Sequence, residues 1–261
     1  MKKLIFLFIL TFSLNAFYVG NIAEPAILEK GIFSDKDPWI KVQTGYLLDF
    51  VNDKKLVSDH NIVAVGNENR INDFEIITNM GKISVTFRER MEIYGMFGQS
   101  AIELNWFAST PNNDDGQFLK IDSDYNFSWI AGVKVILLQF GKIYFGTDFT
   151  YFRIPNIKRS TYFLNAEPIP FSTRPQYLTL REWHLACGVA ATLGPFTPYL
   201  GGKYLLTKIR FRSDNSFNLK NRLTFGIFLG TSVSMGEKFS LNAEARLHDE
   251  LAYSVSGSAA F

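Results

Sequence analysis

Charged side chains recur at every second position within several otherwise apolar segments. Glu244 and Arg246, for example, alternate with Ala243, Ala245 and Leu247. Residues two apart share one face of an extended strand, so this spacing gathers the charges on one side. The residues expected on this polar face are Lys41, Asp49, Glu92, Lys134, Asp148, Glu182, His184, Lys203, Arg222, Glu244 and Arg246. Cations and carboxylates balance in this set, which suits either a hydrated path for small ions or a closed network of ion pairs.

A second kind of chemistry, general acid–base catalysis, needs a histidine beside a carboxylate. Asp59-His60 and His248-Asp249-Glu250 provide both. Neighbours along a loop seldom form a working pair, however. The sequence also has no phosphate-binding or dinucleotide-binding glycine pattern, no G-x-S-x-G turn and no metal-ligand spacing. We therefore predict no enzyme, no cofactor and no metal site, and keep an outer-membrane hydrolase at these histidines as a third alternative.

The composition narrows the class of protein. Of 261 residues, 47% are hydrophobic and 15% aromatic, beside only 9 Pro and 19 Gly, and this balance favours strands. The formal net charge of +2 lacks the basic excess that a phosphate backbone requires, so we expect no nucleic-acid partner. Cys187 is the sole cysteine and excludes a disulfide within the chain.

The first residues have the three parts of a secretory leader. Lys2 and Lys3 give a basic start, an apolar run follows to Leu14, and Ala16 is a small residue suited to cleavage. The run is shorter than the about twenty apolar residues of a spanning helix. We predict a signal peptide over 1–16, a periplasmic segment over 17–37, and the folded domain over 38–261.

Period-two alternation continues through nearly all of the folded domain. In a soluble sandwich the apolar face would be the core, whereas in a membrane barrel it meets lipid. Three features favour the barrel. The strands are long, tight turns alternate with longer polar connections, and the last segment alternates serine with small or apolar residues before a terminal Phe261.

We predict an all-β, transmembrane, antiparallel up-and-down barrel of about ten strands, with eight, twelve or more as alternatives. Long connections are expected near 53–70, 110–124 and 155–176. The expected strands cover 38–52, 71–87, 91–108, 125–138, 142–153, 177–193, 196–211, 219–235, 239–248 and 251–261. In the second of them Phe74 and Ile76 are out of phase with Ile83 and Val85, and the third shows the same change. A bulge or an extra hairpin in each would explain this.

Before the first strand, Glu24 to Gly31 has a proline early and a glycine at its end, as a short helix does. We expect this helix to lie in the periplasmic mouth and to narrow the pore. A flexible periplasmic tail is the alternative.

Three segments carry a resemblance to a known family. They are FYVGNIAEP at 17–25 with Gly31-Ile32, REWH at 181–184 with FTPYLGGK at 196–203, and EARLHDE at 244–250 with the final Phe261. In this order they resemble the opening, middle and end of the chlamydial major outer membrane protein family. Ile22 stands where the family has proline, and family members are usually longer and rich in cysteine.

The resemblance implies an outer-membrane porin in a shortened form. Together with the polar face it predicts a narrow, weakly selective channel for ions and small solutes in the cell outer membrane. A non-conducting structural barrel, or an adhesin that binds through its long loops, is the alternative. The expected partners are outer-membrane lipid and the barrel-assembly machinery, which would recognise the C-terminal strand ending in Phe261, with a homo-oligomer left open.

Overall fold

The computed structural model describes residues 19–27, 39–58, 71, 73–110, 113–164, 167–168, 177–211, 218–236 and 238–261. The predicted signal peptide, residues 1–16, lies outside these ranges. So do Asp59 and His60, together with parts of the long connections near 53–70 and 155–176 through which an adhesin would bind.

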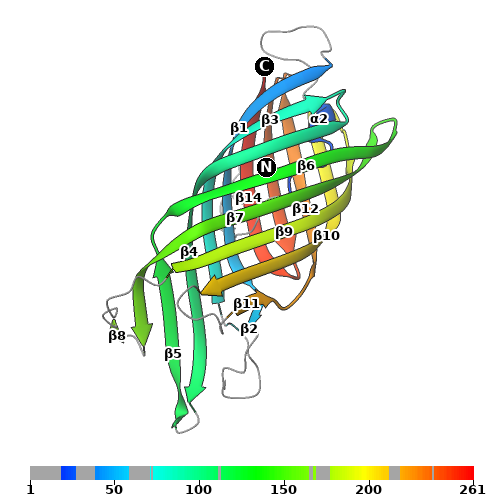
Figure 1. Ribbon diagram of the computed structural model, residues 1–261. Helices are drawn as coiled ribbons and strands as arrows, with labels where there is room; N and C mark the ends of the chain where they lie inside the picture. The colour runs from blue at the N-terminus through cyan, green and yellow to red at the C-terminus, as the bar shows by residue number, and fades with distance from the viewer. Residues whose placement is uncertain are drawn as a thin grey trace, which may run out of the picture.

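Ten antiparallel strands close into a barrel, with the chain winding from one strand to its neighbour (Figure 1). The ring runs through β1 (Ile40–Lys54), β3 (Asp73–Phe87), β4 (Met91–Thr110), β6 (Asn126–Phe140), β7 (Ile143–Leu164), β9 (Tyr177–Ala191), β10 (Phe196–Phe211), β12 (Phe225–Met235), β13 (Phe239–Leu247) and β14 (Glu250–Ala260). Pairing of β14 with β1 closes it. The predicted all-β barrel of about ten strands is confirmed.

Further strands extend the barrel at the end with the longer connections. They are β2 (Leu56–Ser58), β5 (Asn113–Ser123), β8 (Glu167–Pro168) and β11 (Asn218–Asn221). The prediction of loops near 110–124 and 155–176 is therefore wrong in part, because β5 pairs with β4 and β7, and β7 itself continues to Leu164. The polar start of β5 concealed the alternation of Leu119 and Ile121 with Lys120 and Asp122.

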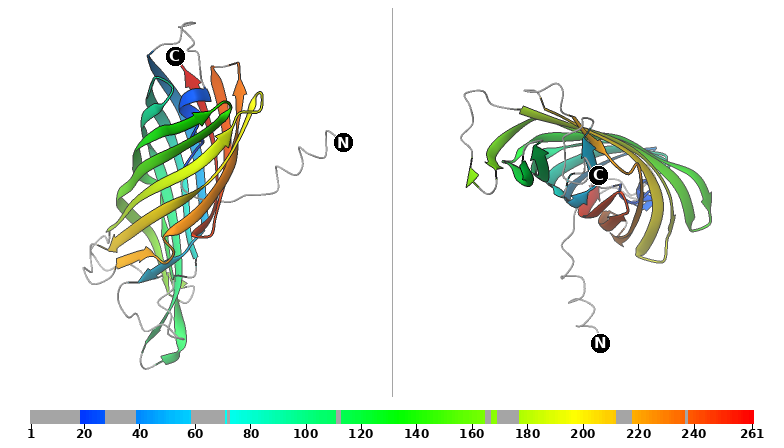
Figure 2. Two further views of the ribbon diagram at one scale, coloured as in Figure 1. Left: turned by 90° about the vertical axis from the view of Figure 1, so that its right-hand side faces the viewer. Right: turned by 90° about the horizontal axis from the view of Figure 1, so that it is seen from below.

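The opposite end carries the tight turns. Gly141, Gly194 and Gly236 adopt positive φ angles there, which glycine tolerates without strain. The C-terminus and the helix α2 (Glu24–Ile27) lie at the same end (Figures 1 and 2). Among the described residues, no helix has the length and apolarity needed to cross a membrane. Short turns and the C-terminus on one side indicate that this end faces the periplasm.

Apolar side chains point out of the barrel wall and polar ones point in. On β13, the exposed fraction is 48% for Leu241 and 2% for its neighbour Asn242. The same alternation holds along most of β1, β3 and β14. The wall therefore offers hydrocarbon an apolar surface and encloses a polar interior, as expected of a membrane barrel.

The phase change within β3 and β4 does not come from a bulge between them, whereas the alternative, an extra hairpin, is present at β4, which pairs with β6 up to Ser100 and with β5 from Glu103 onward. The two strands pair without interruption over the whole of β3. Toward the periplasmic end Ile83 points outward and is 58% exposed, whereas at the other end Phe74 and Ile76 are buried inside and Glu75 faces outward. The strands therefore continue past the apolar band. Beyond it the outward-facing side chains are polar and the inward-facing ones are apolar.

Inward-facing apolar side chains fill much of the extracellular half of the barrel, and most of them come from β3, β4, β7, β9 and β10. We call this group the inner apolar core: Phe74, Ile76, Ile102, Leu104, Ile154, Leu178, Leu180 and Ile209. All are almost completely buried. This packing is that of a soluble core, so hydrophobic burial stabilises the part of the barrel that extends beyond the membrane.

Candidate functional site

The barrel interior gathers nearly all of the residues that the sequence assigned to a polar face. Those inside are Lys41, Asp49, Glu92, Lys134, Asp148, Glu182, His184, Lys203, Glu244 and Arg246, none more than 3% exposed. Arg222 is the exception. It is exposed on the bend between β11 and β12, where its backbone N–H donates to the carbonyl of Lys55 at 2.7 Å. The expected strand over 219–235 is interrupted there, so the alternation does not extend to Arg222.

An ion pair crosses the interior from wall to wall near the extracellular end. Lys54 lies at the end of β1, and its ammonium contacts the carboxylate of Glu182 on β9. β9 is the fifth strand from β1 in either direction around the ring, so the two residues come from opposite walls. Lys54 also lies 3.1 Å from Glu250, and the Thr207 hydroxyl donates to Glu182 at 2.8 Å.

The ion pairs continue from this crossing toward the periplasm. Lys203 contacts Glu250 and lies 3.1 Å from Asp249. Arg246 binds Asp49 at 2.7 Å. Its Nε also lies 3.5 Å from Glu244. We call this group the polar track: Glu182, Lys54, Asp249, Glu250, Lys203, Asp49, Arg246 and Glu244. All its members are buried, and mutual pairing offsets the large cost of removing their charges from water.

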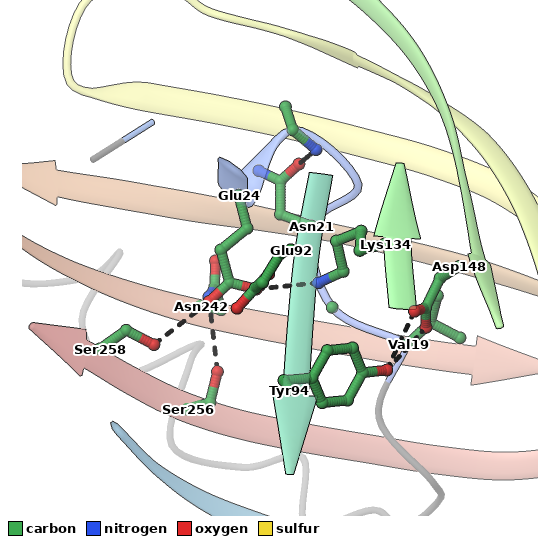
Figure 3. A network of polar contacts seen from close by, with 12 residues as sticks. Val19, Asn21, Glu24, Glu92, Tyr94, Lys134, Asp148, Asn242, Ser256 and Ser258 are labelled. Atoms are coloured by element: carbon green, nitrogen blue, oxygen red, sulfur yellow. Dashed lines mark hydrogen bonds and ion pairs between the residues drawn. The ribbon is translucent and has the colours of Figure 1, made fainter. Parts of the chain in front are cut away.

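The N-terminal segment enters the periplasmic end of the barrel. We call residues 19–27 the N-terminal plug. Its Glu24 accepts hydrogen bonds from Lys82 on β3 at 2.9 Å and Lys134 on β6 at 2.8 Å, and from the Ser258 hydroxyl on β14 at 3.2 Å. Figure 3 shows Glu24 reaching toward Lys134, beside Glu92. One buried carboxylate thus connects three strands of the wall.

The start of the plug contacts the end of the polar track. The backbone N–H groups of Val19 and Gly20 each donate to the Glu244 carboxylate at 2.9 Å. The Asn21 amide donates to the Ser232 hydroxyl at 2.7 Å, and Ile22 packs in a small apolar cluster with Tyr199 and Phe228 among others. The plug is therefore held at both its start and its helix, and it occupies the periplasmic end of the track.

A hydrogen-bonded network joins β4, β7 and β9 on the inner wall. The Tyr94 hydroxyl donates to Asp148 at 2.9 Å (Figure 3). It also lies next to Thr150, and the His184 imidazole is 3.5 Å from Asp148. A Cβ atom at Gly132 would lie 2.3 Å from the Tyr94 ring, so this glycine leaves room for it. The arrangement places a polar, hydrogen-bonded surface on this side of the lumen.

The structure does not bring a catalytic histidine and carboxylates together at the last extracellular hairpin. His248 is exposed, with its Nδ1 3.0 Å from the Phe225 carbonyl, whereas Asp249 and Glu250 point into the barrel. Within the described ranges, no three His, Cys, Asp or Glu side chains are grouped to hold a metal ion.

Sequence reasoning missed several members of the interior network. Lys54 and Glu250 lie just beyond the ends of their expected strands, so they were assigned to connections. Lys82 alternates with Ser84 and Thr86 on the inward face of β3, and this pattern was available in the sequence. The conflicting phase of Phe74 and Ile76 on the same strand hid it.

Comparison with known proteins gives distant relatives. The chain is similar to the major outer membrane porin, serovar L1, of Chlamydia trachomatis, with 23% identity over 328 residues covering 92% of this chain and 82% of the relative. The serovar E porin is 23% identical over 372 residues, covering 93% and 94%. No family model matches the sequence. Among solved structures, an outer-membrane channel from Pseudomonas putida F1 aligns with a TM-score of 0.44 and 10% identity, covering 86% of this chain and 96% of that one.

The curated relatives support a distant, porin-like family of outer-membrane proteins. Together with the closed barrel they support an outer-membrane location for this chain.

Proposed function

We propose that the protein is a porin-type channel of the outer membrane that passes ions and small solutes through a narrow lumen. The observation that carries the proposal is the polar track, a continuous series of inward-facing charges from the N-terminal plug to Lys54 near the extracellular end. Lys54 and Lys203 each contact two carboxylates, so the track offers an ion a succession of charged groups along one line.

The described conformation is the closed one in this proposal. The plug occupies the periplasmic end of the track, and the charges of the track pair with one another rather than with water. Ten strands enclose a lumen near the lower size limit for an aqueous path, so even a small segment blocks it.

Planar-bilayer recording of the purified protein tests the proposal. We expect brief conductance steps of small amplitude from the wild-type chain and longer ones from a chain that lacks residues 17–31. A complete absence of steps from both proteins would contradict a channel function.

The polar track also predicts the sign of the selectivity. Five carboxylates and three cations give it a net negative charge. We therefore expect a potassium-to-chloride permeability ratio above one and below about ten, as measured from the reversal potential in a salt gradient. Asp249→Asn should lower the ratio toward one, whereas Glu103→Gln, on the outer face, should leave it unchanged. A ratio below one in the wild type would contradict the assignment of the track as the path.

A second candidate is a non-conducting structural barrel. The inner apolar core favours it, because this core fills the extracellular half of the lumen beside the track with packed side chains. An absence of conductance steps from the protein that lacks residues 17–31 would favour this function over the channel.

We further propose that residues 1–16 direct export and that β14 is recognised during barrel assembly. β14 closes the ring against β1, and the Phe261 backbone N–H donates to the Val42 carbonyl at 2.8 Å. Because β14 closes the barrel by pairing with β1, the assembly machinery can bind this strand before the barrel closes.

A further inference from the structure

Four cations lie side by side on the outer face of the barrel. Arg153 on β7 pairs with Arg181 on β9, which pairs with Lys208 on β10, which pairs with Lys220 on β11. We call these residues the basic row. Neighbouring strands are about 4.8 Å apart, so the row is about 14 Å long. Figure 1 shows β7, β9 and β10 adjacent on one side of the barrel.

The basic row has its side chains on the outward face. Its members alternate along their strands with Ile154, Leu180, Ile209 and Leu219, which are buried inside. Arg181, Lys208 and Lys220 are exposed, and Arg153 is half-buried. The row therefore faces the surroundings of the barrel and not its lumen.

Most of this charge is not compensated by the protein. Among the described residues, no carboxylate lies within ion-pair distance of Arg153, Arg181 or Lys208, and the buried Nε atom of Arg153 has no hydrogen-bond partner. Like charges directly opposite each other on neighbouring strands destabilise a sheet. An anion from outside the chain would relieve this repulsion.

Aromatic residues near the basic row indicate where it lies relative to the bilayer. Tyr151 and Trp183 are cross-strand partners, two residues toward the periplasm from Arg153 and Arg181. The rings of Trp129 and Tyr151 are 5.3 Å apart on the same face. Tyrosine and tryptophan gather where the hydrocarbon of a bilayer meets its headgroups. Two residues of strand add about 7 Å, so the basic row lies at the level of the outer headgroups.

We propose that the basic row binds the phosphate groups of a glycolipid in the outer leaflet of the outer membrane. Arg153 and Arg181 each offer a planar fork of donors that matches phosphate oxygens, and the lysines add compact positive charge. The length of the row suits a headgroup with two phosphates better than a single ion.

Carboxylates occupy the outer face of other strands. On the other side of the extended wall, Glu75, Glu103 and Asp122 form a similar in-register row of carboxylates on β3, β4 and β5. There the chain supplies a counter-ion, since the Lys120 ammonium lies 2.5 Å from Glu103, whereas the described residues show none for Arg153, Arg181 or Lys208. The basic row therefore needs an anion from outside the chain in a way that the carboxylate row does not need an outside cation, and this inference does not depend on whether the lumen conducts.

The test uses the full chain in detergent and lipid A that carries both of its phosphates. We expect saturable binding that is lost when the lipid is dephosphorylated, and an at least tenfold weaker affinity for Arg181→Gln/Lys208→Gln. The matched control is Arg90→Gln/Lys142→Gln, which removes two exposed cations from the periplasmic turns and should bind lipid A as the wild type does.

Three results would overturn the inference. The first is equal affinity of the Arg181→Gln/Lys208→Gln protein and the wild type, with both shown to be folded by heat-modifiable gel migration. The second is an equal loss in the periplasmic control, which would mean attraction by overall charge. The third is binding of heparin, but not lipid A, through the row, which would make the ligand a sulfated polysaccharide.

Discussion

Glu24→Gln is expected to raise the ratio of open to closed channels about a hundredfold or more. Glu24 is buried and carries the charge-assisted bonds to Lys82 and Lys134. Its neutralisation weakens both charge-assisted bonds, and removal of one member of a buried ion pair costs about 3 to 5 kcal/mol. Only the closed state, with the plug inside the barrel, is destabilised by this amount. Each 1.4 kcal/mol changes the ratio of open to closed channels by a factor of ten.

Single-channel open probability in a planar bilayer measures this ratio. Glu103→Gln is the matched control, since it removes one negative charge from the outer face, far from the plug, and should behave as the wild type. Deletion of residues 17–31 should reproduce the open state of Glu24→Gln. If neither Glu24→Gln nor the deletion alters the open probability, the plug is not the closing element.

Lys54→Met is expected to lower the free energy of unfolding by about 3 to 5 kcal/mol. The ammonium of Lys54 lies between Glu182 and Glu250 and links opposite walls of the barrel. Glu250 keeps Lys203 as a partner, whereas among the described residues Glu182 would keep only the hydroxyl of Thr207. The loss of stability therefore arises mainly from the buried carboxylate of Glu182, which no longer has a cation beside it among the described residues.

Urea unfolding in lipid vesicles, followed by tryptophan fluorescence, measures this loss. Lys158→Met removes an exposed cation at the same end and should change stability by no more than about 0.5 kcal/mol. Adding Glu182→Gln to Lys54→Met should restore at least half of the loss, because the stranded charge is then gone. A Lys54→Met protein within about 1 kcal/mol of the wild type would mean that the crossing pair contributes little.

The alternation of apolar and polar residues was enough to predict the barrel and the place of most strands. Each strand has a period of two wherever one face meets lipid and the other the interior, so Leu241 and Asn242 could be assigned to opposite sides. The same rule failed where the surroundings change along a strand. Phe74 and Ile76 are out of phase with Ile83 because the membrane ends between them, not because the strand is irregular.

The candidate site was predictable strand by strand but not as a network. The spacing of Glu182 and Lys203 shows that they face inward, yet nothing in one strand reveals that Glu182 meets Lys54 from the opposite wall. Such contacts depend on strand tilt and on how the barrel closes, which are properties of the whole ring. The plug shows the same limit, since Glu24 lies in a short segment whose partners are far away in sequence.

Nitroxide labels in a bilayer test the central claim, that the apolar face of each strand meets lipid and that this relation ends near the extracellular side. A label at position 241 should be relaxed by oxygen dissolved in the hydrocarbon, a label at 242 by neither oxygen nor an aqueous nickel chelate, and a label at 75 by the chelate. Access of the chelate to position 241 would show that this face is in water and would contradict the account.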